Sequence, residues 1–231
     1  MEYRNGPIQK YINPLHQQKT MKNEIFSQNL NSNENTEKIS YLSGFIIGDG
    51  NLGKGYIIRA VEENKGFIED VFCEIFNDVF NRKPKIYFDK FNNSFVAYVH
   101  CKEIWNYLAV NVGIETRTKS RTVKTPSMIL NGSEKIKSAF ISGIFDAEGS
   151  VIIMNDNHHK SGYLRIQLKM CSHDLVSEIS TFLSELGIKN RLYKYNTFSM
   201  IQINGKEQCG KFKNIIGFKH SLKNAKLRAF L

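Results

Sequence analysis

The sequence predicts an α+β fold built from two similar halves. A nine-residue stretch occurs twice, as LSGFIIGDG at 42–50 and as ISGIFDAEG at 141–149. After each copy, the apolar residues follow the same order of helical and strand-like spacing. A repeat constrains the whole architecture, because each copy is expected to form the same local structure.

The repeat also divides the chain into segments. We expect a first half at 39–111 and a second half at 138–231, joined by a basic connector at 112–137. Residues 1–38 have no counterpart in the second half and are polar, so we expect a poorly ordered N-terminal arm there.

Each repeated stretch has the pattern of a helix that ends at its last glycine. Bulky apolar residues lie on one face at helical spacing, and small residues lie on the other. Glycine inside a helix costs about 1 kcal/mol relative to alanine. The pairs Gly44/Gly48 and Gly143/Ala147 therefore indicate that two helices pack with their backbones in contact. Gly50 and Gly149 stand where a helix commonly ends.

This arrangement places Asp49 and Glu148 side by side at two helix C-termini. A carboxylate is unfavourable at the negative end of a helix dipole, and two together are worse. A divalent cation would reverse that balance, and Mg²⁺ is bound by one or two carboxylates with water and substrate phosphates. The alternative is two ordinary exposed acids, which the matching pair disfavours.

Both stretches resemble the LAGLIDADG motif of homing endonucleases, in the single-chain form with two motifs. The resemblance implies two pseudo-symmetric αββαββα halves packed through the motif helices, each with a curved antiparallel sheet that lies in the DNA major groove. It also implies that Asp49 and Glu148 hold Mg²⁺, which Mn²⁺ can replace, aided by backbone carbonyls near Gly48 and Ala147. The first motif departs at its sixth position, where Ile47 replaces the usual Asp; the second motif has Asp146 there.

The remaining elements are expected in chain order from their apolar patterns. The first half should contain a turn at 51–55, a strand at 56–62, a helix at 64–80, a hairpin formed by 85–91 and 94–100, and a short helix at 103–110. The second half should contain a strand at 150–154, a polar turn at 155–162, an alternating strand at 164–171, a helix at 175–186, a hairpin formed by 188–195 and 199–203, and a last helix that begins near 221.

Composition favours a nucleic-acid partner. The chain of 231 residues carries a net charge of +10 and has no apolar run near the 18 residues needed to span a bilayer. Its four cysteines are scattered without a C-x-x-C pair, which predicts reduced thiols in an intracellular protein of the cytoplasm, nucleoid or an organelle matrix.

Polar residues on the strands are candidates for DNA contact and catalysis. Arg suits guanine and Gln suits adenine in the major groove. The candidates for base contact are Arg59, Glu62, Arg165, Gln167, Lys194 and Gln202. Family members place lysines or glutamines near the metals, and Lys169 is the candidate for that role; the alternative is a DNA contact without a catalytic role. The first-half equivalent of Lys169 is expected near Glu62 or Glu63, which departs from the family pattern and predicts unequal strand cleavage.

These features together predict a monomeric, site-specific homing endonuclease that makes double-strand breaks in a long, non-palindromic DNA target. Two alternatives stay open: an intron-encoded RNA maturase that assists group I intron splicing, and a non-catalytic DNA-binding regulator of the same fold. An intein is disfavoured, because the chain has no room for a separate splicing domain.

Overall fold

The structure, a computed structural model, describes residue 30 and residues 32–116, 120–156 and 159–231. Residues 37–231 form one compact unit, separate from 1–36. Most of the predicted N-terminal arm lies outside the described residues. The first motif helix already begins at Asn33, within the segment predicted to be arm.

The two halves share the order helix, two strands, helix, two strands and helix, and the second half adds one more helix, α10 (Ser221–Arg228). The first half contains α2 (Asn33–Asp49), β1 (Gly50–Gly53), β2 (Ile57–Glu62), α3 (Lys65–Phe67), η1 (Ile68–Cys73), α4 (Glu74–Phe80), β3 (Lys85–Asp89), β4 (Ser94–His100), α5 (Lys102–Asn106) and η2 (Tyr107–Val112). The connector contains α6 (Ser127–Leu130). The second half contains α7 (Glu134–Glu148), β5 (Gly149–Asp156), β6 (His159–Met170), α8 (His173–Glu185), β7 (Arg191–Lys194), β8 (Ser199–Asn204), α9 (Gly205–Ile215) and α10 (Ser221–Arg228).

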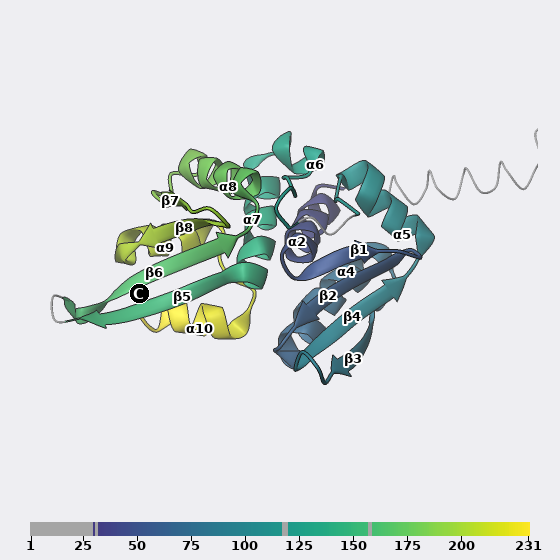
Figure 1. The fold of residues 1–231 in the computed structure, drawn as a ribbon, viewed down its shortest axis with the longest axis horizontal. Coiled ribbons are helices and arrows are strands. Elements are labelled where there is room, and N and C mark those ends of the chain that lie inside the picture. Colours follow the sequence, from purple (N-terminus) through teal and green to yellow (C-terminus); the bar gives the residue numbers. More distant parts are fainter. Residues whose placement is uncertain (1–29, 31, 117–119, 157–158) are drawn as a thin grey trace, which may run out of the picture. The chain divides into compact units, whose positions relative to one another are not determined.

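Each half holds one four-stranded antiparallel sheet. The strand orders are β1-β2-β4-β3 and β5-β6-β8-β7, so the two sheets have identical topology. Figure 1 shows α2 and α7 between the two sheets. The predicted α+β fold with two pseudo-symmetric halves is confirmed.

Local sequence explains where several elements begin and end. The Ser172 hydroxyl accepts the Leu175 N–H at 3.2 Å and caps the start of α8, and Gly187 ends that helix with a φ of 73°. In the first half, Asn64 caps α3 by accepting the Phe67 N–H at 3.0 Å.

Four expectations for these elements need correction. The segment after the first motif helix forms the short strand β1, where we expected only a turn. Residues 155–162 mostly extend the β5–β6 hairpin, and its tip at 157–158 lies outside the described residues. Helix α9 was not predicted, because only a few apolar residues of this polar segment face the core. Helix α7 begins at Glu134, inside the predicted connector.

The motif helices anchor both cores through buried phenylalanines. The Phe45 ring of α2 lies 5.4 Å from that of Phe72, and the Phe145 ring of α7 lies 4.9 Å from that of Phe212. All four side chains are buried, and each contributes about 1.5–3 kcal/mol to stability. The ends of α2 and α7 are therefore fixed relative to both sheets. None of the described helices is both long and apolar enough to cross a membrane.

Candidate active site

The two motif helices meet with their backbones in direct contact. A Cβ added at Gly44 would clash with the Phe140 carbonyl oxygen, and one added at Gly143 would clash with that of Tyr41. At the helix ends, a Cβ on Gly48 would lie 2.5 Å from the Ala147 Cβ and 3.2 Å from the Glu148 Cγ. No larger side chain fits at these three glycines without moving a helix, which confirms the close approach predicted from the sequence.

This contact brings Asp49 and Glu148 to the same place. Burial raises the pKa of Asp49 to about 6, with the charge of Glu62 as the next cause and that of Lys223 opposing it. Burial likewise raises the pKa of Glu148 to about 7, with the charge of Asp49 as the next cause and Lys223 again opposing. The ionised form of Asp49, which is half-buried, is thus destabilised by its surroundings, and that of Glu148 less so, because Glu148 is exposed.

The donor set fits a hard divalent cation. Among the described residues, no three His, Cys, Asp or Glu side chains gather into a metal site. Mg²⁺ does not require three, because it accepts one or two carboxylates and completes its shell with water, carbonyls and substrate phosphates. Asp49 and Glu148 lie together at two helix ends, and the pKa values of both are raised. A cation bound there would relieve the repulsion between the two carboxylates. Asp49, Glu148 and the carbonyl of Gly48 would hold it, whereas the Ala147 carbonyl, also expected as a ligand, already accepts a hydrogen bond from the Lys223 Nζ at 3.0 Å.

Asp146, the acid at the sixth motif position, has a different role. Its side chain is fully buried and accepts the Tyr41 hydroxyl at 2.8 Å and the backbone N–H groups of Lys219 and His220 at 3.0 and 3.1 Å. It therefore ties both motif helices to the segment that precedes α10. In the first motif Ile47 stands at this position, so only the second motif makes this connection.

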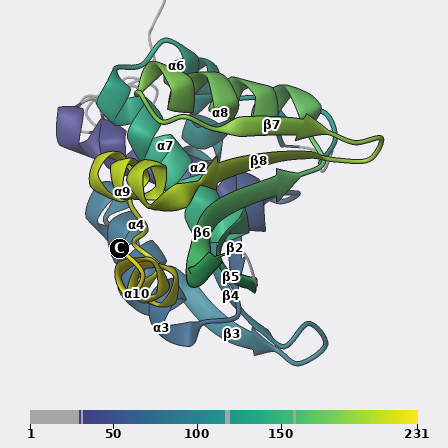
Figure 2. The same cartoon turned by 90° about the vertical axis from the view of Figure 1, so that its left-hand side faces the viewer.

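Lys223, on α10, places an amine at the end of α7, near Asp49 and Glu148. Its Nζ donates hydrogen bonds to the carbonyls of Phe145, Asp146 and Ala147 at 3.2, 2.5 and 3.0 Å, at the C-terminal end of α7. Burial lowers the pKa of Lys223, against the opposing charges of Asp146, Glu62, Asp49 and Glu148. Figure 2 shows α10 in the lower part of the view, beside the elements of the first half. No local pattern in the sequence marks this lysine, because it lies far from both motifs along the chain.

Glu62 and His220 join the first half to the base of α10. The Glu62 Oε1 lies 3.7 Å from the His220 Nε2, and the same oxygen accepts the Asn64 N–H at 2.9 Å. The His220 ring stacks on Phe67 with 4.6 Å between centroids. Burial acts to raise the pKa of Glu62, but the contacts with His220 and the Asn64 N–H lower it overall. Glu62 is therefore an ionised neighbour of Asp49.

Each sheet turns a polar row away from its helices. The strand pairings place one row across the first sheet and the equivalent row across the second. The first row is Asn51, Arg59, Tyr98 and Lys85. The second row is Ser150, Gln167, Gln202 and Arg191. The two rows differ at every position, so the two halves offer different hydrogen-bonding groups.

Comparison with known proteins finds one domain family that matches part of the chain. Residues 135–217 match the LAGLIDADG-like domain family. The chain contains a LAGLIDADG domain. The structure of the chain is similar to that of mesophilic variants of the homing endonuclease I-DmoI, with a TM-score of 0.57 and 21% sequence identity. The match covers 79% of this chain and 96% of the I-DmoI chain. I-DmoI has been solved in complex with DNA and Mn.

The same fold occurs outside the homing endonucleases. The full-length DUF199/WhiA protein of Thermotoga maritima matches over 90% of this chain and 64% of its own, with a TM-score of 0.58 and 14% identity. A curated relative, the glutamine–fructose-6-phosphate aminotransferase of Methanocaldococcus jannaschii, is 26% identical over 203 residues. That match covers 85% of this chain but only 18% of the aminotransferase. The fold alone therefore does not decide the function.

Four of the predicted DNA-contact residues lie on the face turned away from the helices. Arg59 is exposed there, and the Arg165 Nε donates to the Asn204 Oδ1 at 2.8 Å. Gln167 and Gln202 are directly paired across β6 and β8, and Gln202 is largely covered by its neighbours.

Glu62 and Lys194 do not share that face. Glu62 lies three residues after Arg59 on β2, so it belongs to the opposite face of the sheet. Its side chain is only 11% exposed and is turned toward His220. On β7, Lys194 lies on the same face of the sheet as Leu192, which is the face opposite to that of Arg191. The sequence identified these strands but assigned both residues to the wrong face. Arg191 occupies the polar face of β7 instead.

Lys169 lies on β6, one residue beyond the partner of Gly149. Its side chain is exposed on the polar face of β6, with the Nζ 4.1 Å from the centroid of the Phe198 ring. Gly50 pairs with Ala60 in the first half, and Gly149 pairs with Leu168 in the second. The residue after Ala60 is Val61 and the residue after Leu168 is Lys169, so Val61 is the first-half equivalent of Lys169. Our expectation of Glu62 or Glu63 at that place is wrong. The catalytic role of Lys169 stays a prediction.

Proposed function

We propose that this chain is a site-specific, Mg²⁺-dependent homing endonuclease that makes double-strand breaks in a non-palindromic DNA target. The observation that carries this proposal is the pair Asp49 and Glu148, held together where α2 and α7 touch. Their pKa values are raised to about 6 and about 7. A protein that used these helices only for packing would gain stability from neutral residues at both positions.

The chain's own residues supply the geometry for phosphodiester hydrolysis. Asp49 and Glu148 offer one carboxylate from each half, so each could serve one strand of a duplex. When bound there, Mg²⁺ would activate water and neutralise charge on the phosphate. Lys223 holds the carbonyl end of α7 in place and adds a fixed positive charge beside both acids.

The polar rows suit recognition of duplex DNA. Arg59 and Arg191 can each donate two hydrogen bonds to guanine, and Gln167 can pair with adenine. Each good pair discriminates against a wrong base by about 1–3 kcal/mol. The overall charge of +10 adds sequence-independent attraction to phosphates. I-DmoI, whose fold this chain shares, has been solved with DNA, which supports the proposal.

The aminotransferase relative supports mobility between genes. A segment similar to 85% of this chain makes up 18% of an enzyme with unrelated chemistry. That pattern is expected of a module that moves between genes, which is what homing endonucleases do.

The test is a cleavage assay beside a gel-shift assay at fixed salt, with the wild type, Asp49→Asn and Glu148→Gln. We expect either substitution to abolish double-strand cleavage while DNA binding persists. Wild-type cutting by either variant would exclude the carboxylate pair as the active site. Binding without cutting by the wild type in Mg²⁺ would favour the DNA-binding regulator, and a gain in splicing of an intron RNA would favour the maturase.

A further inference from the structure

We propose that Phe91, at the tip of the β3–β4 hairpin, stacks on a base of the bound DNA duplex beside the scissile phosphate nearest to Asp49. This inference rests on the proposed DNA-binding function and adds a contact that distorts the DNA. Phe91 belongs neither to the carboxylate pair nor to the polar rows of the two sheets.

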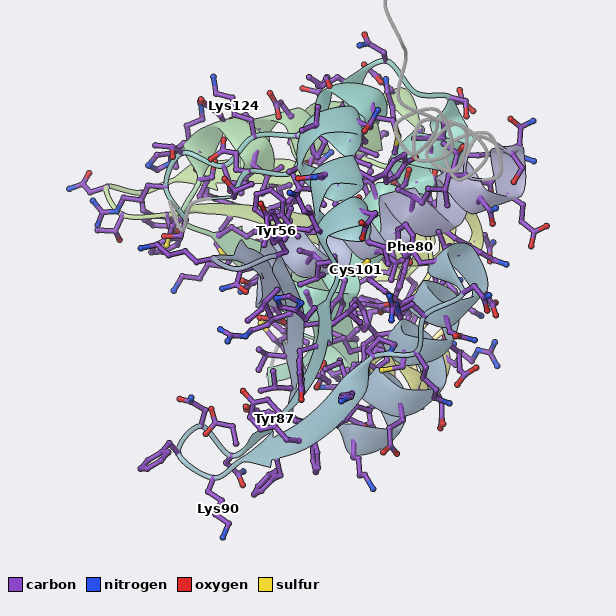
Figure 3. The ribbon with its side chains drawn as sticks, turned by 90° about the vertical axis from the view of Figure 1, so that its right-hand side faces the viewer. Tyr56, Phe80, Tyr87, Lys90, Cys101 and Lys124 are labelled. Atoms are coloured by element: carbon purple, nitrogen blue, oxygen red, sulfur yellow. The ribbon has the colours of Figure 1, made fainter. Side chains whose placement is uncertain are left out.

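The β3–β4 hairpin exposes three aromatic side chains within five residues. Phe91 is 100% exposed, and Tyr87 and Phe88 are exposed by 47% and 45%. Tyr87 and Phe88 are consecutive on β3, so they point to opposite faces of the sheet, where their rings contact those of Tyr98 and Phe95. Phe91 lies beyond the end of the strand and is the fully exposed ring that the hairpin offers to a partner. Figure 3 shows Tyr87 on β3 and Lys90 at the end of the hairpin that projects from the sheet.

The turn that carries Phe91 is held in one conformation. The two carboxylate oxygens of Asp89 accept the Phe91 N–H at 3.0 Å and the Asn92 side-chain amide at 2.8 Å. Asn93 completes the turn in the left-handed region with a φ of 48°. Because the backbone is fixed, presenting the ring to a partner costs little conformational entropy.

In the equivalent hairpin of the second half, the two aromatic residues contact each other, and Tyr195 is 47% exposed. The Tyr195 ring stacks on that of Phe198, with 4.5 Å between centroids and 26° between planes. The Lys169 Nζ lies over the same Phe198 ring. Phe91 is fully exposed and has no such cover, so the two hairpins differ in what they offer to a partner.

The position and charge of the hairpin indicate that the partner is DNA. Asp89, where the turn begins, and Asp49 line the same hollow of about 350 Å³, so the tip lies at the metal-binding end of the sheet. Lys85 precedes the aromatic residues, Lys90 stands directly before Phe91, and both lysines are exposed. Apolar side chains that enter between base steps unstack the bases and kink the duplex. Stacking of a base on an aromatic ring raises affinity by a factor of about 5 to 100.

The test uses the target DNA with 2-aminopurine placed at successive positions around the mapped cuts, and Ca²⁺ in place of Mg²⁺ to prevent cleavage. We expect the wild type to change the 2-aminopurine fluorescence at one position, on the side cut by the first half. Phe91→Ala should remove that change and weaken binding at least about fivefold. Phe91→Trp, which keeps an aromatic ring, should restore both.

Two controls separate the possible outcomes. Val110→Ala removes another exposed apolar side chain, on η2, and should leave both signals unchanged. Because Phe91 is fully exposed, its variants should melt at the wild-type temperature. A fluorescence change that survives in Phe91→Ala, or self-association of the free protein that depends on Phe91, would overturn this inference. Failure of the wild type to bind any DNA would instead overturn the proposed function.

Discussion

Replacing Asp49 by asparagine should make the metal-free protein more stable while removing its activity. Burial raises the pKa of Asp49 from 3.8 to about 6. Each pKa unit corresponds to about 1.4 kcal/mol. After a discount for partial exposure to solvent, the ionised carboxylate costs the folded state about 2 kcal/mol. Asparagine has nearly the same shape and carries no charge, so it should recover that amount.

The sign of the pH dependence follows from linkage. A carboxyl group whose pKa is raised by folding destabilises the folded state above the folded pKa and has no effect below the unfolded pKa. The gain from Asp49→Asn should therefore be complete above about pH 7, decline through pH 6 to 5 and vanish near pH 4. For a chain of this length, about 2 kcal/mol corresponds to a rise in melting temperature of about 4–8 °C.

The assay is thermal unfolding in EDTA at pH 8 and at pH 4, with Asp70→Asn as the control. Asp70 is an exposed acid on η1, where substitution should change stability by no more than about 0.5 kcal/mol. Added Mn²⁺ should stabilise the wild type and not Asp49→Asn. A loss of stability at pH 8, or an equal gain at both pH values, would refute the account of this site as a destabilised metal centre.

Three further predictions concern the reaction. Lys169→Ala should slow single-turnover cleavage far more than it weakens binding; an equal loss of affinity with an unchanged cleavage rate would make Lys169 a contact residue. Ca²⁺ should support DNA binding without cutting, because it accepts looser geometry and more ligands than Mg²⁺, and full activity in Ca²⁺ or EDTA would contradict the mechanism. Lys223→Met should shift the acidic limb of the cleavage pH profile to higher pH, because Lys223 lowers the pKa of both acids. Lys223→Arg, which keeps the positive charge, should keep the wild-type profile. An unshifted profile in Lys223→Met would leave Lys223 only a structural role.

The sequence was sufficient to predict the motif helices, the order of the main strands and the pairing of Asp49 with Glu148. Those features follow from local apolar spacing and from glycines that only a close helix contact explains. β1 was missed because it is a four-residue, glycine-rich strand that resembles a turn.

Features that depend on contacts between distant segments could not be read from the sequence. The face on which Glu62 lies depends on strand register, and a shift of one residue exchanges the two faces. Lys223 reaches the end of α7 from a helix whose start is held by hydrogen bonds from the Lys219 and His220 N–H groups to Asp146. The first-half counterpart of Lys169 became clear only from the pairing of Gly50 with Ala60.

The most direct test of the central claim is selection of cleaved sites from a randomised DNA library in Mg²⁺, with sequencing of the cut ends. The two halves present Asn51, Arg59, Tyr98 and Lys85 on one sheet, and Ser150, Gln167, Gln202 and Arg191 on the other. We therefore expect a single chain to cut both strands of a non-palindromic site whose half-sites have unrelated sequences. A palindromic site bound by two chains, or no cleaved site at all, would contradict this account.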